Sequence, residues 1–210
     1  MQRQWRMSGK WRAWLIGTAI GLLATTTSIQ TVRAGDQDLS LADLAGSYAG
    51  SGGGFLTLCF TPTSPPADAG CAKPSSLAVQ FNDADVLEST VSPDGQFCVT
   101  VTTVDSPVGG SKFPAFINHF IAGGSVTSYD PRTGRGTADF TFYNAADGVS
   151  CKRATVVNPR SAQPVAHGTE DTQFGEAPAL HFNYVFTSFT GVAGNFGGSV
   201  LSGTLYIQHE

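Results

Sequence analysis

The sequence predicts an all-β protein, an antiparallel barrel or sandwich built from short strands. Apolar and polar residues alternate along much of the chain, which is the pattern of strands with one buried face. Turns rich in Gly, Pro and Asp separate these stretches at regular intervals. The 14 Phe and 5 Tyr residues supply enough apolar area for a packed core, which argues against disorder.

The charged residues are distributed unevenly along the chain. The first 34 positions hold five of the 12 Lys and Arg residues and none of the 16 Asp and Glu residues. The remainder of the chain is therefore acidic. Because phosphate binding requires a basic surface, nucleic acid is not expected as a partner.

The basic N-terminal segment, residues 1–34, has the features of a secretory signal peptide. A basic start precedes the apolar run 14–24, and a polar stretch ends at Ala34, with compact residues where signal peptidase cleaves. The apolar run is shorter than the ~20 residues of a spanning helix, and an uncleaved anchor is the alternative. We expect cleavage after Ala34, a single soluble domain over residues 35–210 without a membrane span, and a secreted or periplasmic location.

All four cysteines follow this segment, and an oxidising compartment favours disulfides. We expect the pairs Cys59–Cys71 and Cys98–Cys151, because the first pair encloses a turn-rich loop. A metal site is not expected, since the sequence contains no Cys-x-x-Cys pair and no His at ligand spacing from a Cys.

The expected elements follow in a regular order. Residues 35–45 suggest one short helical turn, with Ser40 as its cap and Asp43 three residues later. Pro93 marks a turn between two strands, and residues 130–136 join two more as a hairpin. The expected strands are 55–60, 77–81, 97–104, 125–129, 137–143, 152–157, 180–190 and 200–209.

Two segments depart from the strand pattern. Residues 113–122 carry apolar side chains at helical spacing, which predicts a short amphipathic helix that covers one end of the barrel. A bent strand is the competing interpretation. Residues 158–179 contain almost no apolar side chain, so we expect a long disordered connection, with a functional loop as the alternative.

Several motifs resemble those of lipocalin-like barrels. Gly46-Ser47-Tyr48, after a short turn, is similar to the Gly-x-aromatic opening of these proteins, although lipocalins usually carry Trp where Tyr48 stands. The hairpin at 124–140 and the paired segments 180–186 and 201–205 resemble hairpins of small exported bacterial barrel proteins. The resemblance covers under half of residues 35–210 and implies a barrel rather than a particular ligand.

Motifs for catalysis do not occur in the sequence. Neither a Gly-x-Ser-x-Gly elbow nor a His-Glu-x-x-His pair is found, and the glycine-rich stretch 50–54 reads as a flexible turn or bulge. The acid pairs lack the twelve-residue pattern of a calcium loop, so we interpret them as cap and turn residues. These pairs are Asp36 with Asp38 and Asp83 with Asp85. We therefore assign no catalytic residue, metal or cofactor.

The most informative functional signal is a set of aromatic residues on single faces of strands that should be neighbours. These residues are Phe140, Phe142, Phe182, Tyr184 and Phe186. In a small barrel such side chains either fill the interior or form the wall of a pocket for one apolar ligand. His119 stands among apolar residues and is expected at the rim of the same pocket.

We therefore expect an exported, non-enzymatic binding protein that holds a small hydrophobic ligand in its barrel. The alternative is a protein-interaction module of the cell envelope, either a structural protein or a hydrolase inhibitor. Such a module would have a filled barrel and would act through residues 158–179 or an exposed strand edge. A third hypothesis, an enzyme, requires a His and a carboxylate within hydrogen-bond reach at the barrel mouth.

Overall fold

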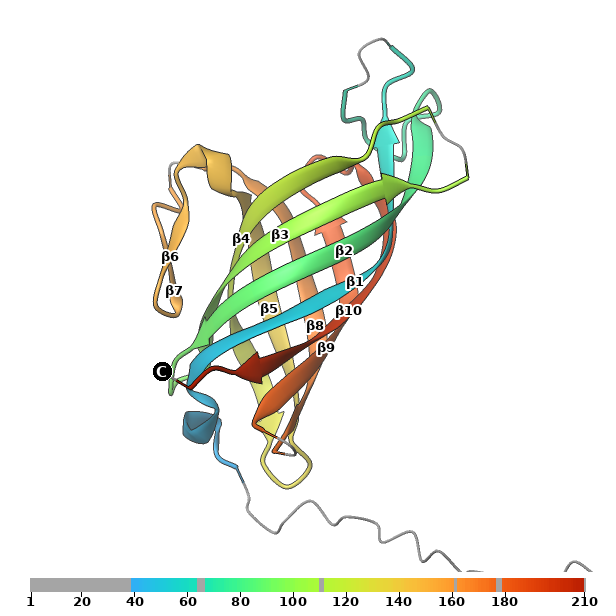
Figure 1. Cartoon of the computed structure of the whole chain (residues 1–210). Coiled ribbons are helices and arrows are strands. Elements are labelled where there is room, and N and C mark those ends of the chain that lie inside the picture. Colours follow the sequence, from blue (N-terminus) through green and yellow to red (C-terminus); the bar gives the residue numbers. More distant parts are fainter. Residues whose placement is uncertain (1–38, 64–66, 110–111, 161, 177–178, 210) are drawn as a thin grey trace, which may run out of the picture. The chain divides into compact units, whose positions relative to one another are not determined.

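The computed structural model describes residues 39–63, 67–109, 112–160, 162–176 and 179–209. The predicted signal peptide lies outside these ranges. The described part forms a closed antiparallel barrel of eight strands, so the predicted barrel is confirmed (Figure 1). The barrel strands are β1 (Gly46–Phe60), β2 (Leu77–Val91), β3 (Gln96–Pro107), β4 (Phe116–Asp130), β5 (Arg135–Asn144), β8 (Pro164–Gly175), β9 (His181–Gly191) and β10 (Phe196–Ile207).

The strands follow the order β1-β10-β9-β8-β5-β4-β3-β2 around the barrel. β1 pairs with both β10 and β2, which closes the barrel. Side chains alternate between the lumen and the outer surface because successive residues of a strand point to opposite faces. On β2 every second residue from Val79 to Val91 is buried. A barrel of eight strands has an interior just wide enough to be filled by side chains or to hold one small ligand.

A short 3-10 helix, η1 (Leu41–Leu44), covers the end of the barrel where β1 begins (Figure 1). The predicted cap is present: the Ser40 backbone N–H and hydroxyl both donate to Asp43 Oδ2, at 2.8 and 2.6 Å. Leu44 is fully buried, and the Tyr48 hydroxyl donates a 2.6 Å hydrogen bond to its carbonyl oxygen. The helical turn is therefore fixed to β1 by packing and by a buried hydrogen bond.

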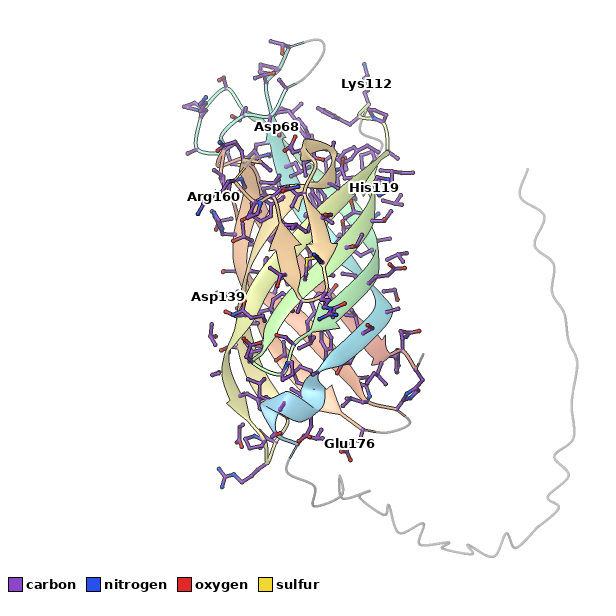
Figure 2. The ribbon with its side chains drawn as sticks, turned by 90° about the vertical axis from the view of Figure 1, so that its left-hand side faces the viewer. Asp68, Lys112, His119, Asp139, Arg160 and Glu176 are labelled. Carbon is purple, nitrogen blue, oxygen red and sulfur yellow. A yellow bond between two sulfur atoms is a disulfide. The ribbon has the colours of Figure 1, made fainter. Side chains whose placement is uncertain are left out.

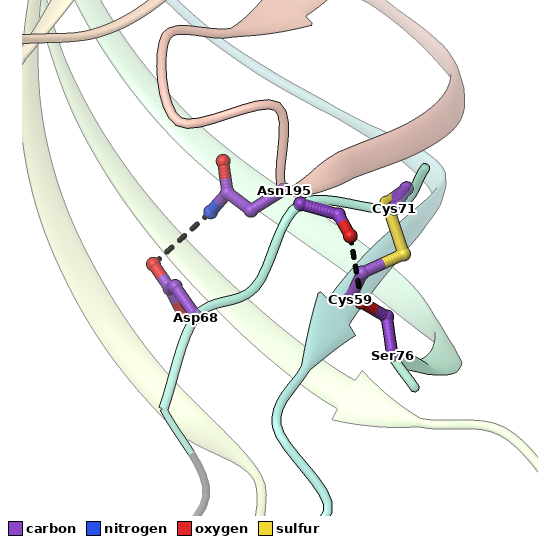
Figure 3. Close-up of a disulfide and its surroundings, with 6 residues drawn as sticks. Cys59, Asp68, Cys71, Ser76 and Asn195 are labelled. Carbon is purple, nitrogen blue, oxygen red and sulfur yellow. Dashed lines mark hydrogen bonds between the residues drawn. A yellow bond between two sulfur atoms is a disulfide. The ribbon is translucent and has the colours of Figure 1, made fainter. Parts of the chain in front are cut away.

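Aromatic rings pack together at the opposite end of the barrel. The Phe60 ring lies 4.7 Å from that of Phe113 and 6.2 Å from that of Phe81, which in turn lies 5.2 Å from Phe116. The loop after β1 is fastened there by the Cys59–Cys71 disulfide. Asn195 strengthens this attachment, since its side-chain Nδ2 donates to Asp68 Oδ2 at 3.0 Å and its backbone carbonyl accepts from the Cys59 N–H (Figure 3).

A small hairpin packs on the outer surface of the barrel. It consists of β6 (Ser150–Lys152) and β7 (Thr155–Val157), which follow the 3-10 turn η2 (Ala145–Asp147). The Cys98–Cys151 disulfide ties the hairpin to β3, and Ile121 of β4 is buried in the same cluster. A Cβ at Gly123 would stand 2.0 Å from Val156 Cγ2, so the hairpin lies directly against β4.

Both predicted disulfides are confirmed, and they account for all four cysteines. Such bonds indicate an oxidising, extracytoplasmic environment. The helical segments found in the described ranges are too short to reach across a bilayer.

Five predictions about local structure are wrong. Residues 116–122 of the predicted helix form the start of β4, and residues 164–175 of the supposed loop form β8. The glycine-rich stretch 50–54 lies in the middle of β1 and is no turn. The predicted strand 152–157 is divided between β6 and β7. Asp83 and Asp85 are not turn residues, because they lie on β2 with their side chains inside the barrel.

Candidate functional site

The five aromatic residues singled out in the sequence meet inside the barrel. Phe140 and Phe142 come from β5, whereas Phe182, Tyr184 and Phe186 come from β9. Their rings form a continuous array, with centroid distances of 4.5 Å for Phe140–Phe186 and 5.4 Å for Tyr184–Phe186. β5 and β9 are separated by β8, whose inward residues Ala166 and Gly168 are small, so the rings of both strands meet over them.

One interior cavity, which we name the Glu170 cavity, has a volume of ≈ 50 Å³. All five of these aromatic residues line it, together with Ala122, Ala138, Phe174 and Leu205. Besides the Tyr184 hydroxyl, three side chains with carboxyl or hydroxyl groups interrupt this apolar wall: Glu170 and Thr172 of β8, and Ser89 of β2. β2 and β8 are four strands apart in either direction around the barrel, so these groups approach the cavity from opposite walls.

The second cavity, the aspartate cavity, has a volume of ≈ 70 Å³ and contains three acidic side chains, Asp83, Asp85 and Asp105. Thr103 and Asn118 add polar groups, and Phe120, Phe189 and Phe196 add apolar wall. The side chains of Val101, Phe142 and Phe186 line both cavities. These three side chains therefore form the partition between the two spaces.

The three aspartates form a compact cluster on neighbouring strands. Asp83 lies directly opposite Asp105 in the β2–β3 register, and Asp85 lies opposite Thr103. The Thr103 hydroxyl donates to Asp105 Oδ2 at 3.3 Å. The residues are only 8%, 9% and 3% exposed in the order Asp83, Asp85 and Asp105. Within the described part, the Oδ1 atom of each has no hydrogen-bond partner.

Burial changes the acidity of all four interior carboxyls. Removal from water, reinforced by the neighbouring Asp85, raises the pKa of Asp83. Burial likewise raises the pKa of Asp85, and burial together with Asp83 raises that of Asp105 to about 7. Burial alone raises the pKa of Glu170 to about 8. Burial followed by the nearby Asp85 and Glu170 carboxyls also raises the pKa of the Tyr184 hydroxyl.

Among the described residues, no basic group lies in the lumen to balance these acids. Every Lys and Arg side chain in the described ranges is exposed, and none of them lines either cavity. The Ser89 and Thr172 hydroxyls are also without a hydrogen-bond partner among the described residues, although each residue is more than nine-tenths buried. Buried polar groups in proteins are usually paired, so this set of interior groups is unusual for a purely structural core.

His119 was predicted at the rim of the pocket, but the structure places it elsewhere. It is exposed on the outer face of β4, where its Nδ1 lies 3.1 Å from the Thr102 hydroxyl (Figure 2). Asp139 also points outward, from β5. The acid–base pair that an enzyme would require at the barrel mouth is therefore not formed by these residues.

Sequence reasoning missed the acidic residues of the lumen. Asp83 and Asp85 were recognised only as turn residues, while Glu170 and Asp105 received no role. One signal was available: both aspartates occupy the inward positions of a stretch that alternates from Val79 to Val91. Glu170 had no comparable signal. Because Gly168 and Thr172 stand at inward positions of β8, apolar and polar residues do not alternate along this strand.

Among the described residues, the His, Cys, Asp and Glu side chains form no group of three arranged to hold a metal ion. Compared with known proteins, the chain matches no family model, no curated protein and no solved structure. Conclusions about function therefore depend on the lumen itself.

Proposed function

We propose that the protein is an exported, lipocalin-like binding protein that holds a small, largely apolar ligand in its lumen. The observation that carries this proposal is the presence of unpaired polar groups among the aromatic side chains of the interior. A core built only for stability loses free energy by burying such groups, about 1–3 kcal/mol for each one left unpaired. A ligand that pairs with them explains why they stand there.

The size of the cavities limits the ligand. Volumes of ≈ 50 and ≈ 70 Å³ are small beside the ~150 Å³ cavity that accepts benzene. Rotation of Phe142 and Phe186, which line both spaces, would join them into one site along the barrel. The proposed ligand is therefore small and occupies the lumen by displacing the partition formed by these rings.

The proposal is tested by isolating the full chain after export from a host cell and recording native mass spectra, followed by denaturing extraction. A bound apolar small molecule is the expected result. A barrel that carries no molecule, and that also fails to bind the small apolar probe benzene, would overturn the proposal.

A matched pair of variants shows whether a bound molecule lies in the lumen. Ala122→Val adds two methyl groups to the wall of the Glu170 cavity, whereas Ala84→Val adds the same groups to an exposed position of β2. Val favours strands, so both variants are expected to fold. Only Ala122→Val should lose the ligand, and equal retention by both variants would place the ligand outside the barrel.

A different observation favours a protein-interaction module as the second candidate. Apolar side chains are exposed side by side on the outer face: Phe55 opposite Val200, and Ile117 opposite Val104. Closure of the barrel pairs the edges of its strands. The candidate contact surface is therefore this apolar outer face and not the exposed strand edge that the sequence suggested. Cross-linking in envelope extracts, with Phe55→Ser and Ile117→Ser as variants, should capture a partner that the double variant loses.

A further inference from the structure

We propose that the ligand of the lumen is a small apolar amine whose ammonium group pairs with the carboxyl group of Glu170. This inference rests on the proposed function and names the chemical class of the ligand. It follows from the charge, the hydrogen-bonding groups and the wall of the Glu170 cavity.

The charge of the lumen selects against anions. Four carboxyl groups, those of Glu170 and the three aspartates, face the two cavities, and no Lys or Arg of the described ranges joins them. An anionic ligand would find no cationic partner in this poorly solvated space and would meet like charge at each carboxyl that ionises, which is costly. A cation supplies the missing opposite charge.

The hydrogen-bonding groups of the Glu170 cavity suit a donor with several N–H bonds. An ammonium group has three donors and no acceptor. The ionised Glu170 carboxylate is an acceptor only, and the Ser89 and Thr172 hydroxyls have free acceptor lone pairs. These two hydroxyls are more than nine-tenths buried and face the cavity from opposite walls. A primary ammonium group within the cavity would satisfy groups that are otherwise unpaired.

The remaining wall suits the rest of such a molecule. Phe140, Phe174 and Phe182 line the same cavity and present apolar area to an alkyl chain. Aromatic faces also attract a nearby cation, by about 0.5–2 kcal/mol, which an uncharged alcohol would not gain. The cavity volume of ≈ 50 Å³ restricts the amine to a few carbon atoms unless the Phe142 and Phe186 partition moves.

The pairing has a proton balance that can be measured. In the empty barrel, burial raises the pKa of Glu170 to about 8, so the carboxyl is mainly protonated at pH 7. The ammonium group arrives charged, Glu170 releases its proton to solvent, and a carboxylate–ammonium pair forms. The other titratable groups near this position are Tyr184 and the three aspartates of the second cavity. Binding of the amine at pH 7 should therefore release close to one proton.

The test uses three probes of equal length with the full chain: n-butylamine, 1-butanol and butyrate. Isothermal titration calorimetry at pH 7 in two buffers of different ionisation enthalpy measures both affinity and proton release. We expect n-butylamine to bind at least tenfold more tightly than 1-butanol, butyrate to bind most weakly, and only the amine to release a proton.

Variants locate the ammonium group. Glu170→Gln keeps the shape of the side chain and should remove both the amine preference and the proton release. The matched control Glu88→Gln alters an exposed glutamate of β2 and should change neither. If Asp85→Asn abolished the amine preference and Glu170→Gln did not, the assignment to Glu170 would be wrong.

The outcomes separate this inference from the function on which it depends. Equal binding of 1-butanol and n-butylamine would overturn the amine proposal and leave an apolar ligand site in place. If none of the three probes and no benzene entered the barrel, both proposals would be overturned.

Discussion

Asp83 and Asp105 lie directly opposite each other on β2 and β3, with both side chains inside the barrel. Like charges this close in a buried site do not both ionise readily, so the pair favours its protonated form. A structural core has no need of such a pair. It therefore links the stability of the fold to pH and marks the lumen as chemically distinct from the outer surface.

The barrel should lose stability as the pH rises through neutrality. The interior carboxyls have folded pKa values above the 3.8 and 4.5 of solvent-exposed Asp and Glu, with about 7 for Asp105 and about 8 for Glu170. The folded state thus binds more protons than the unfolded chain, and its stability falls with pH. The contribution is fully present below about pH 4 and is lost by about pH 8. Urea unfolding from pH 4 to pH 9 measures this slope.

The Asp105→Asn variant identifies the source of this pH dependence. It removes one ionisable partner of the Asp83 pair, so we expect a flatter profile and a gain of about 1–3 kcal/mol at pH 8. Asp139→Asn, on the outer face of β5, serves as the control and should leave the profile unchanged. An unaltered slope in Asp105→Asn would show that other groups dominate the titration.

The Tyr48 hydroxyl should contribute measurably to stability. Tyr48→Phe removes the 2.6 Å hydrogen bond to the Leu44 carbonyl and leaves that buried acceptor without this donor. We expect a loss of about 1–2 kcal/mol in the free energy of unfolding. Tyr206→Phe, which removes the hydroxyl of a tyrosine that is 45% exposed, should cost much less. Equal losses for the two variants would contradict the role assigned to this bond.

Gly52 is required because Tyr184 lies over it. A Cβ at this position would stand 2.1 Å from the Tyr184 hydroxyl oxygen and 2.9 Å from the carbonyl oxygen of Ser202. Gly52→Ala should therefore displace Tyr184 and cost about 1–3 kcal/mol. Tyr184→Phe removes the closest atom, so the same substitution should cost less in that background. A double-mutant cycle by denaturant unfolding measures the coupling, and additive effects would argue against this contact.

The two disulfides should stabilise the barrel to different extents. In the loop-entropy relation, the 53-residue separation of Cys98–Cys151 contributes about 4 kcal/mol and the 12-residue separation of Cys59–Cys71 about 3. Replacement of each pair by alanine, followed by urea unfolding, tests this order. Loss of the Cys98–Cys151 bond should also release the β6–β7 hairpin from the barrel and uncover Ile121. Backbone amides around Ile121 should then exchange hydrogen faster. A larger loss for the shorter link would contradict the relation.

The sequence predicts the barrel where alternation is complete, and it fails where packing hides the pattern. In β8 the inward positions 166 and 168 hold Ala and Gly because a ring from β5 occupies the space there. A Cβ at Gly168 would meet Phe140 at 2.3 Å. In β4 the inward Phe116 and Phe120 combine with the outward Ile117 and Ile121 to imitate helical spacing. Ile121 is apolar on an outer face because the small hairpin covers it, which no local pattern reveals.

The aromatic residues of the candidate site could be predicted because each of their strands alternates strongly. The acids could not, since a carboxyl at an inward position is identified only when the register of the whole strand is known. Asp83 and Asp85 become interior residues only because β2 continues without a break from Leu77 to Val91. The position of His119 depends in the same way on a strand that the sequence presented as a helix.

Pairing of β1 with β10 has a consequence for how the chain folds. Tyr48 and Ile207 are partners across this seam although they stand near opposite ends of the described chain. A strand synthesised early therefore waits with an unpaired edge until the final segment, Phe196–Ile207, is available. Such non-local contacts slow folding and leave edges open to incorrect association. Barrel closure should accordingly be a late event, completed only after the whole chain has emerged.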